Sequence, residues 1–228
     1  MTKPPHTDTP DPAVLEQIEA LPLITGRPLI ISDADEVLIQ FLAGLERYLE
    51  TRDLWLDLQS FALTGNIRHV GTNEPFAAAN MPALLEDFFA AQAEKLDIVP
   101  GAADSLATLS ERAQIVVLTN VPFAAREARA ASLAANGIDY PVIANKGLKG
   151  AAVRHLAARV DAPVIFLDDI PHNITSVAKA HAPARLIHFI ADTRLARLIP
   201  PCSDSHFHTS EWPAAQGFIE QQLSDAGF

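Results

Sequence analysis

The sequence has little cysteine and little positive charge, and it has no long apolar run. Cys202 is the only cysteine, so no disulfide can form within the chain. Lysine and arginine total 17 against 28 aspartate and glutamate residues, and the formal net charge of −11 would repel nucleic acid and anionic lipid. No stretch approaches the roughly 18 consecutive apolar residues of a membrane span, and no apolar leader precedes the first helix. We therefore expect a cytoplasmic protein that binds neither nucleic acid nor membranes.

Several common catalytic motifs are also missing. The sequence has no glycine-rich phosphate loop ending in Lys-Ser or Lys-Thr, no His-Glu-x-x-His and no Gly-x-Ser-x-Gly. Three candidate zinc ligands, Cys202, His206 and His208, lie close together near the C-terminus. The alternation His-Phe-His also fits a terminal edge strand with both histidines on one face, and we favour that interpretation over a zinc site.

What the sequence does contain predicts an α/β fold. It has 228 residues, 49% of them hydrophobic and 20% charged, which is enough for one main core with a small insertion. Short apolar runs typical of strands alternate with segments in which apolar residues recur at helical spacing. Strands that are apolar on both faces and separated by helices indicate a Rossmann-like parallel sheet covered on both sides. The expected strands are Leu29–Ile31, Ile115–Leu118, Val142–Ala144, Val164–Leu167 and Leu186–Ile190, and the expected core helices are Ala13–Leu21, Ala102–Arg112, Ala124–Asn136, Gly150–Val160 and His172–His181.

This alternation is interrupted after the first strand. Ile39–Thr51, Leu54–Leu63 and Met81–Leu96 all read as helices, which predicts an inserted α-helical cap over residues 41–97. The insertion is acidic, with four basic and nine acidic residues. Residues 13–40 and 98–228 would form the α/β core, and the proline-rich residues 1–12 would form a flexible tail.

Polar residues follow the predicted strands at the points where they end. Asp33 and Asp35 follow the first strand, Thr119 and Asn120 the second, and Asp168 with Asp169 the fourth. In an open parallel sheet these ends share one edge, where ligands bind. Carboxylates gathered there repel one another, by about 4 kcal/mol for two charges 4 Å apart at an effective dielectric near 20. A cation is therefore expected, and a site made only of oxygen ligands suits Mg²⁺.

The order of these residues resembles the four motifs of the haloacid dehalogenase superfamily. The corresponding segments are Asp33-Ala34-Asp35-Glu36-Val37-Leu38, Val117-Leu118-Thr119-Asn120, Lys149 and Phe166-Leu167-Asp168-Asp169. The resemblance spans about residues 29–169 and implies a Rossmann-like core with a cap inserted after the first motif. It also implies a Mg²⁺-dependent mechanism that passes through a phosphorylated aspartate.

The resemblance assigns a role to each motif residue. Asp33 would be the nucleophile, and Asp35 the general acid that protonates the leaving oxygen and then the base that activates water. Thr119 and Lys149 would hold the phosphoryl oxygens. The metal ligands would be Asp33, Asp35 through its backbone carbonyl, Asp169 and the neighbouring Asp168.

Two departures from the family pattern bear on this assignment. Glu36-Val37 stands where phosphatases of the family usually have Gly-Thr, which leaves the geometry of this loop open. Lys146 competes with Lys149 as the motif lysine; we favour Lys149 because Val153 and Leu156 continue an apolar helical face from it.

The expected activity is hydrolysis of a small phosphorylated metabolite by a phosphomonoesterase. Asn120 would assist in binding the substrate, and Arg68 with His69, in a connector between cap segments, would recognise it or serve only as a connector. Dehalogenation is disfavoured because halide displacement does not need the acid or base that Asp35 supplies. The alternative is a non-catalytic relative that binds Mg²⁺ or a phosphorylated ligand as a regulatory or interaction module. The sequence does not indicate the substrate or the oligomeric state.

Overall fold

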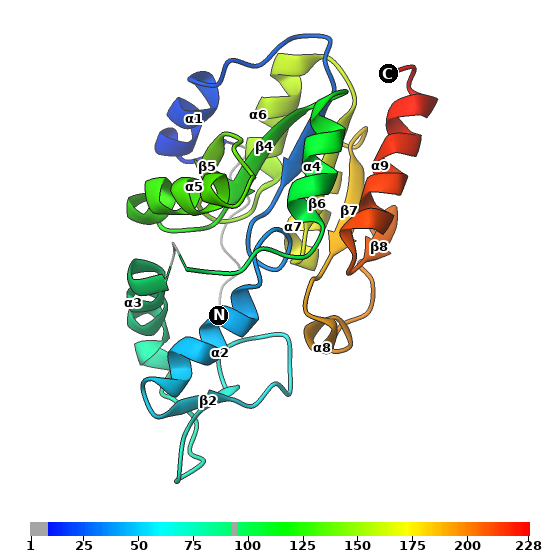
Figure 1. The fold of residues 1–228 in the computed structure, drawn as a ribbon. Helices are drawn as coiled ribbons and strands as arrows, with labels where there is room; N and C mark the ends of the chain where they lie inside the picture. The colour runs from blue at the N-terminus through cyan, green and yellow to red at the C-terminus, as the bar shows by residue number, and fades with distance from the viewer. Residues whose placement is uncertain (1–8, 93–94) are drawn as a thin grey trace.

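A parallel six-stranded sheet forms the centre of the molecule (Figure 1). The computed structural model describes residues 9–92 and 95–228. All neighbouring strands of the sheet run parallel, in the order β5-β4-β1-β6-β7-β8. The strands are β1 (Leu29–Ser32), β4 (Gln114–Thr119), β5 (Val142–Ala144), β6 (Val164–Asp168), β7 (Arg185–Phe189) and β8 (Phe207–Thr209).

Helices cover both faces of this sheet because its strands are apolar on both sides. In β1, Leu29 and Ile31 pack into one apolar cluster and Ile30 into the other, as the alternation of side chains along a strand requires. The first cluster is covered by α1 (Pro12–Glu19), α6 (Gly150–Val160) and α7 (Pro171–Ala180). The second is covered by α4 (Ala102–Ser110), α5 (Arg126–Ala135) and α9 (Trp212–Asp225). The expected α/β Rossmann-like fold is confirmed.

The predicted core elements are also confirmed, with shifts of one or two residues at most ends. The terminal edge strand is β8, which pairs parallel to β7. The His188 and His208 rings lie 4.9 Å apart between their centroids, and the His206 Nδ1 accepts a hydrogen bond from the Leu186 amide. Within residues 9–92 and 95–228 no zinc-like cluster forms around these histidines. The predicted tail at 1–12 falls mostly outside the described residues, and α1 already begins at Pro12.

The insertion between β1 and α4 is mixed rather than wholly helical. It contains α2 (Phe41–Glu50), the antiparallel pair β2 (Leu54–Leu56) and β3 (Ile67–His69), the short helix η1 (Ala78–Asn80) and α3 (Met81–Gln92). The helix predicted over Leu54–Leu63 is wrong. Its first residues alternate in burial, with Leu54 buried and Trp55 exposed, which is the pattern of a strand.

The chain enters and leaves the cap side by side. The Gln40 amide donates to the Asp97 carbonyl, and the Val99 amide donates to the Leu38 carbonyl, at 2.9 and 2.8 Å. The paired linkers fit the predicted boundaries of the cap, although the division into core and cap stays a prediction. None of the helices in the described ranges is long and apolar enough to cross a membrane.

Candidate active site

The polar residues predicted from the strand ends gather at one edge of the sheet. Asp33 follows β1, Thr119 ends β4, and Asp168 ends β6. They lie together because β1 pairs with both β4 and β6 in parallel register. A cavity of about 260 Å³ lies between this edge and the cap, and Asp33, Asp35, Thr119, Asn120, Lys149 and Asp169 line it.

Lys149 links two of the carboxylates. Its Nζ lies 2.7 Å from Asp33 Oδ1 and 2.7 Å from Asp168 Oδ2, and its side chain is buried. Burial alone would lower the pKa of Lys149, but the Asp168 and Asp33 carboxylates outweigh this effect and raise it, so the ammonium stays charged. With three donors and two carboxylate partners, the ammonium retains one proton for a ligand in the cavity.

The start of α6 fixes the position of this lysine. Lys149 directly precedes the helix, and Gly150 is its first residue. A Cβ at Gly150 would collide with the carbonyl of Ser176 in α7, so only glycine allows the two helices to pack this closely. Lys146, the competing candidate, is 73% exposed, pairs with Asp11 and is not among the residues that line the cavity. Of the two lysines, Lys149 is the one that lines the cavity.

The adjacent carboxylates Asp168 and Asp169 differ in their surroundings. Asp168 Oδ1 accepts hydrogen bonds from the Ile170 amide and the Asn173 side chain, both at 2.9 Å, while its Oδ2 faces Lys149. No hydrogen bond or ion pair to the Asp169 carboxylate is found in the described part of the chain. Burial and the nearby Asp168 and Asp33 raise the pKa of Asp169 well above its ordinary value. The Asp168 carboxylate is therefore held by protein donors, whereas no described lysine or arginine forms an ion pair with the Asp169 carboxylate.

These residues fit a divalent cation. Asp33, Asp168 and Asp169 each offer a carboxylate oxygen, and these oxygens lie within 4.8 Å of one another. Burial also raises the pKa of Asp33, with Asp168 adding to the effect and Lys149 opposing it. One lysine does not balance three buried carboxylates, and an all-oxygen set suits Mg²⁺. Asp33 and Asp169 are the carboxylates best placed to hold it, because both oxygens of Asp168 are already engaged.

Asp35 pairs with an arginine that the sequence analysis did not identify. Arg129 Nη1 lies 2.6 Å from Asp35 Oδ1, and the arginine side chain is fully buried. Burial raises the pKa of Asp35, and Arg129 opposes this rise. The Phe89 ring of α3 lies over the guanidinium, with 5.8 Å between Cζ and the ring centroid. The carboxylate of Asp35 is therefore held in one orientation at the wall of the cavity.

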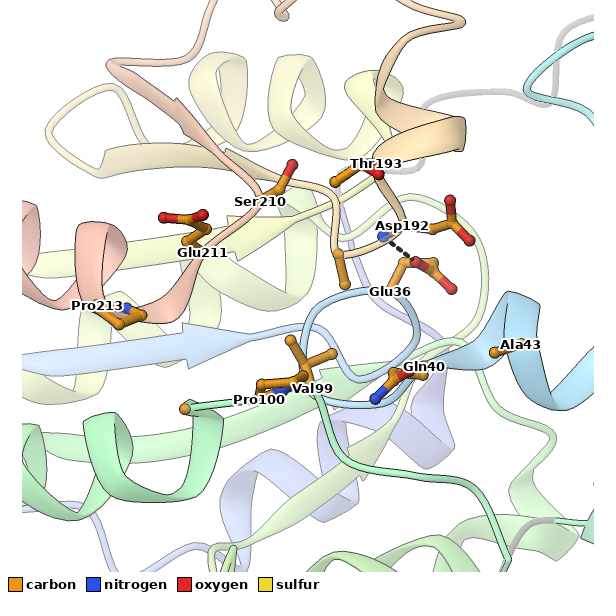
Figure 2. Close-up of a pocket in the computed structure, with 12 residues that line it drawn as sticks. Glu36, Gln40, Ala43, Val99, Pro100, Asp192, Thr193, Ser210, Glu211 and Pro213 are labelled. Atoms are coloured by element: carbon orange, nitrogen blue, oxygen red, sulfur yellow. Dashed lines mark hydrogen bonds between the residues drawn. The ribbon is translucent and has the colours of Figure 1, made fainter.

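Glu36 supports the loop that follows β1. Its backbone has φ of +57°, in the left-handed region that favours glycine. Its carboxylate accepts hydrogen bonds from the Leu42 amide at 2.7 Å and the Asp192 amide at 2.8 Å, and Figure 2 shows the second of these. The Trp212 Nε1 donates to the Val37 carbonyl at 2.8 Å. Glu36 thus has a structural role beside the two aspartates.

The remaining polar side chains complete the floor of the cavity. Thr119 Oγ1 is buried and has no hydrogen-bond partner among the described residues, so it is available to a ligand. Asn120 bonds to the Gly147 carbonyl and to Asn145, which orient its side chain. Asn173, which the sequence analysis missed, lines the cavity and supports Asp168. Its only signal in the sequence is its place one helical turn after Asp169.

Arg68 and His69 do not reach this cavity. Both belong to β3 of the cap hairpin, and neither is among the residues that line it. Arg68 Nε lies 2.7 Å from Asp57 Oδ2, and Arg68 Nη1 donates to the Asn73 carbonyl at 3.1 Å. The His69 ring faces Phe76, 5.8 Å away between centroids. The expectation that these residues bind substrate is therefore corrected, because their partners lie within the hairpin.

A larger cavity of about 530 Å³ lies on the other side of Glu36 (Figure 2). Its polar lining includes the carboxylates of Glu36, Asp192 and Glu211, and no lysine, arginine, histidine or cysteine among the described residues faces it. Its described lining therefore offers no cationic side chain to bind an anion. The smaller cavity, where Lys149 and Arg129 meet the carboxylates, is the better candidate for the active site.

Solved structures with the same fold belong to the haloacid dehalogenase group. A haloacid dehalogenase-like protein of unknown function from Agrobacterium tumefaciens superposes with a TM-score of 0.58 at 17% identity, covering 86% of this chain and 99% of its own. A family hydrolase from Deinococcus radiodurans, solved with phosphate and sodium, gives 0.59 at 15% identity, covering 87% and 98%. A putative hydrolase from Bacillus subtilis, bound to magnesium, gives 0.54 at 13% identity, covering 86% and 99%. The chain therefore has the haloacid dehalogenase fold.

Sequence comparison adds nothing to this likeness, because no protein-family model and no curated protein matches the chain.

Proposed function

We propose that the chain is a Mg²⁺-dependent phosphomonoesterase that acts through a phosphorylated Asp33. The observation that carries the proposal is the arrangement around Lys149, whose Nζ lies 2.7 Å from both Asp33 and Asp168 at the floor of the cavity between the sheet edge and the cap. The orphan hydroxyl of Thr119 faces the same space. The fold supports a hydrolase, and relatives of this fold were solved with phosphate and with magnesium.

In the first step, the Asp33 carboxylate attacks phosphorus, so that an oxygen–phosphorus bond forms to Asp33 as the bond to the leaving oxygen breaks. Asp35, on the cavity wall, gives the proton that the leaving oxygen needs. The free proton of Lys149 and the hydroxyl of Thr119 donate to the phosphoryl oxygens.

In the second step, Asp35 accepts a proton from water as the water oxygen bonds to phosphorus and Asp33 is released. Mg²⁺, held by Asp33, Asp169 and the Asp35 carbonyl, would offset the negative charge of the phosphoryl group among the carboxylates. Arg129 keeps the Asp35 carboxylate in place through both steps.

The proposal is tested by a screen of phosphorylated metabolites with and without Mg²⁺, with release of inorganic phosphate as the readout. The expected result is Mg²⁺-dependent hydrolysis that is lost in Asp33→Asn, which keeps the shape of the side chain and removes the nucleophile. Lys146→Gln is a matched control, because this exposed lysine lies outside the cavity. Ligand binding without hydrolysis would instead support the non-catalytic alternative and overturn the proposal.

A further inference from the structure

The cavity has two chemically different sides. Its polar and charged side chains all come from the core, at or near the strand ends. Every described cap side chain that lines it is a hydrocarbon, and together these side chains form what we call the apolar roof. The apolar roof consists of Phe41, Leu42, Phe61, Leu63, Leu85 and Phe89.

The arginines of the cap form ion pairs outside the cavity. Its three arginines pair with carboxylates of the insertion itself: Arg47 with Asp97, Arg52 with Asp87 and Arg68 with Asp57. Glu46, on α2, makes an ion pair with Arg194 of α8 (Thr193–Ala196), at the core side of the cap boundary. Among the described cap side chains that line the cavity, none carries a charge that could contact the part of a substrate beyond its phosphoryl group.

The aromatic part of the apolar roof is fixed by its own contacts. The Phe41 ring lies 5.3 Å from Phe88 and 6.0 Å from Phe89 between centroids, and Phe88 and Phe89 lie 5.5 Å apart. Phe89 also packs over Arg129. Because each of these rings packs against at least one other ring, the aromatic part of the roof is a well-packed apolar wall of the cavity.

The size of the cavity limits what can lie under this roof. An apolar cavity of about 150 Å³ holds a benzene molecule. The volume of about 260 Å³ therefore accommodates a phosphoryl group at the polar floor together with one ring-sized group under the apolar roof. A hydroxyl placed there would lose its hydrogen bonds to water and gain none from the roof.

We propose that the substrate is the phosphate monoester of a compact apolar alcohol, about the size of one six-membered ring and the carbon that carries the phosphate. This inference rests on the proposed phosphomonoesterase activity and adds the nature of the leaving group. A phosphorylated sugar or polyol fits the same floor but places several hydroxyls against hydrocarbon. The expected preference is about 100-fold or more, because a single mismatched polar group in an apolar pocket changes kcat/KM by about that factor.

The test compares cyclohexylmethyl phosphate with glucose 6-phosphate, in the presence of Mg²⁺. Both are phosphates of primary alcohols on a six-membered ring, so they differ mainly in the hydroxyls. We expect kcat/KM to be about 100-fold higher for cyclohexylmethyl phosphate. Equal values or a preference for glucose 6-phosphate would overturn the inference while leaving the phosphomonoesterase proposal standing. Hydrolysis of other phosphate monoesters in the screen, but not of cyclohexylmethyl phosphate, would also overturn the inference alone. No Mg²⁺-dependent hydrolysis of any phosphate monoester in the screen or of these compounds would overturn both.

Variants of the apolar roof give a second readout. Leu85→Asn, on α3, and Leu63→Asn, in the loop before β3, should each lower kcat/KM for cyclohexylmethyl phosphate about 10-fold, chiefly through KM. Hydrolysis of acetyl phosphate, whose acyl group is much smaller, should fall less than hydrolysis of cyclohexylmethyl phosphate, and thermal unfolding shows that the variants fold. Glu86→Gln is the matched control on the exposed side of α3. An equal loss on both substrates would mean that the roof shapes the catalytic floor and would overturn its role in recognising the leaving group.

Discussion

Glu36 makes the stability of the metal-free protein depend on pH. Burial raises the pKa of its carboxyl from 4.5 to about 7. The backbone amides of Leu42 and Asp192, which donate hydrogen bonds to this carboxylate, lower the pKa and offset part of the rise. A carboxyl whose pKa is higher in the folded than in the unfolded chain binds protons preferentially in the folded state. Its contribution to stability is therefore complete below pH 4.5 and is lost as the pH rises through 7. At about 1.4 kcal/mol for each pKa unit, the loss is about 3 kcal/mol.

The substitution Glu36→Gln isolates this contribution, because glutamine is uncharged at every pH. In EDTA, the difference in unfolding free energy between wild type and variant should shift by about 3 kcal/mol between pH 4 and pH 8, with wild type favoured at the acid end. Urea denaturation followed by the fluorescence of the buried Trp212 measures it. A difference that stays constant with pH, or that shifts the other way, would refute the reasoning from burial.

Three further predictions concern the carboxylates and their partners. Asp169→Ala should weaken Mg²⁺ binding more than Asp168→Ala in a calorimetric titration, since the Asp169 carboxylate has no hydrogen-bond or ion-pair partner among the described residues; equal affinities or the reverse order would show that the ligand is misassigned. Arg129→Met should lower kcat about 10- to 100-fold with little change in KM, because Asp35 loses its fixed orientation; steady-state kinetics with unchanged kcat would contradict this. Arg68→Ala should leave kcat/KM within 2-fold and lower Tm by about 2–4 °C, as expected for loss of a half-buried ion pair worth about 1 kcal/mol; a selective rise in KM would return Arg68 to the substrate site.

The sheet and the gathering of polar residues at one of its edges could be predicted because they follow from local rules. The strands are apolar on both faces, which in a chain of alternating strands and helices indicates a parallel sheet. Parallel strands bring their carboxyl ends to one edge, so residues as distant as Asp33 and Asp168 could be expected to meet. The choice of Lys149 over Lys146 likewise followed from an apolar helical face that continues from Lys149.

The cap was less predictable because its structure depends on tertiary contacts. The segment Leu54–Leu63 has enough apolar residues for a helix, yet its first residues pair with β3 as a strand. Arg68 and His69 lie in the cap near the site in sequence, but only the three-dimensional structure shows that Arg68 turns toward Asp57. Charge alone did not indicate which partner an arginine would choose.

Arg129 is the reverse case: nothing in the sequence indicated a place near the site, yet the structure puts it there. It lies on an alanine-rich helix, where a charged residue ordinarily faces solvent. In the structure it is fully buried and reaches Asp35, 94 residues earlier in the chain. A pairing over this distance leaves no local pattern, so the sequence could not reveal it. The role of Glu36 was similarly hidden, because its second partner, the amide of Asp192, is 156 residues away.

The central claim is that Asp33 carries the phosphoryl group during turnover. Wild-type protein, Mg²⁺ and the best substrate from the screen would be mixed and quenched with acid during turnover, and the peptide containing residue 33 analysed by mass spectrometry. We predict a phosphoryl group on Asp33 that requires Mg²⁺ and disappears once the substrate is consumed. We predict that Asp33→Asn shows neither the modification nor turnover. Hydrolysis without phosphorylation of Asp33, or wild-type turnover by Asp33→Asn, would contradict the mechanism.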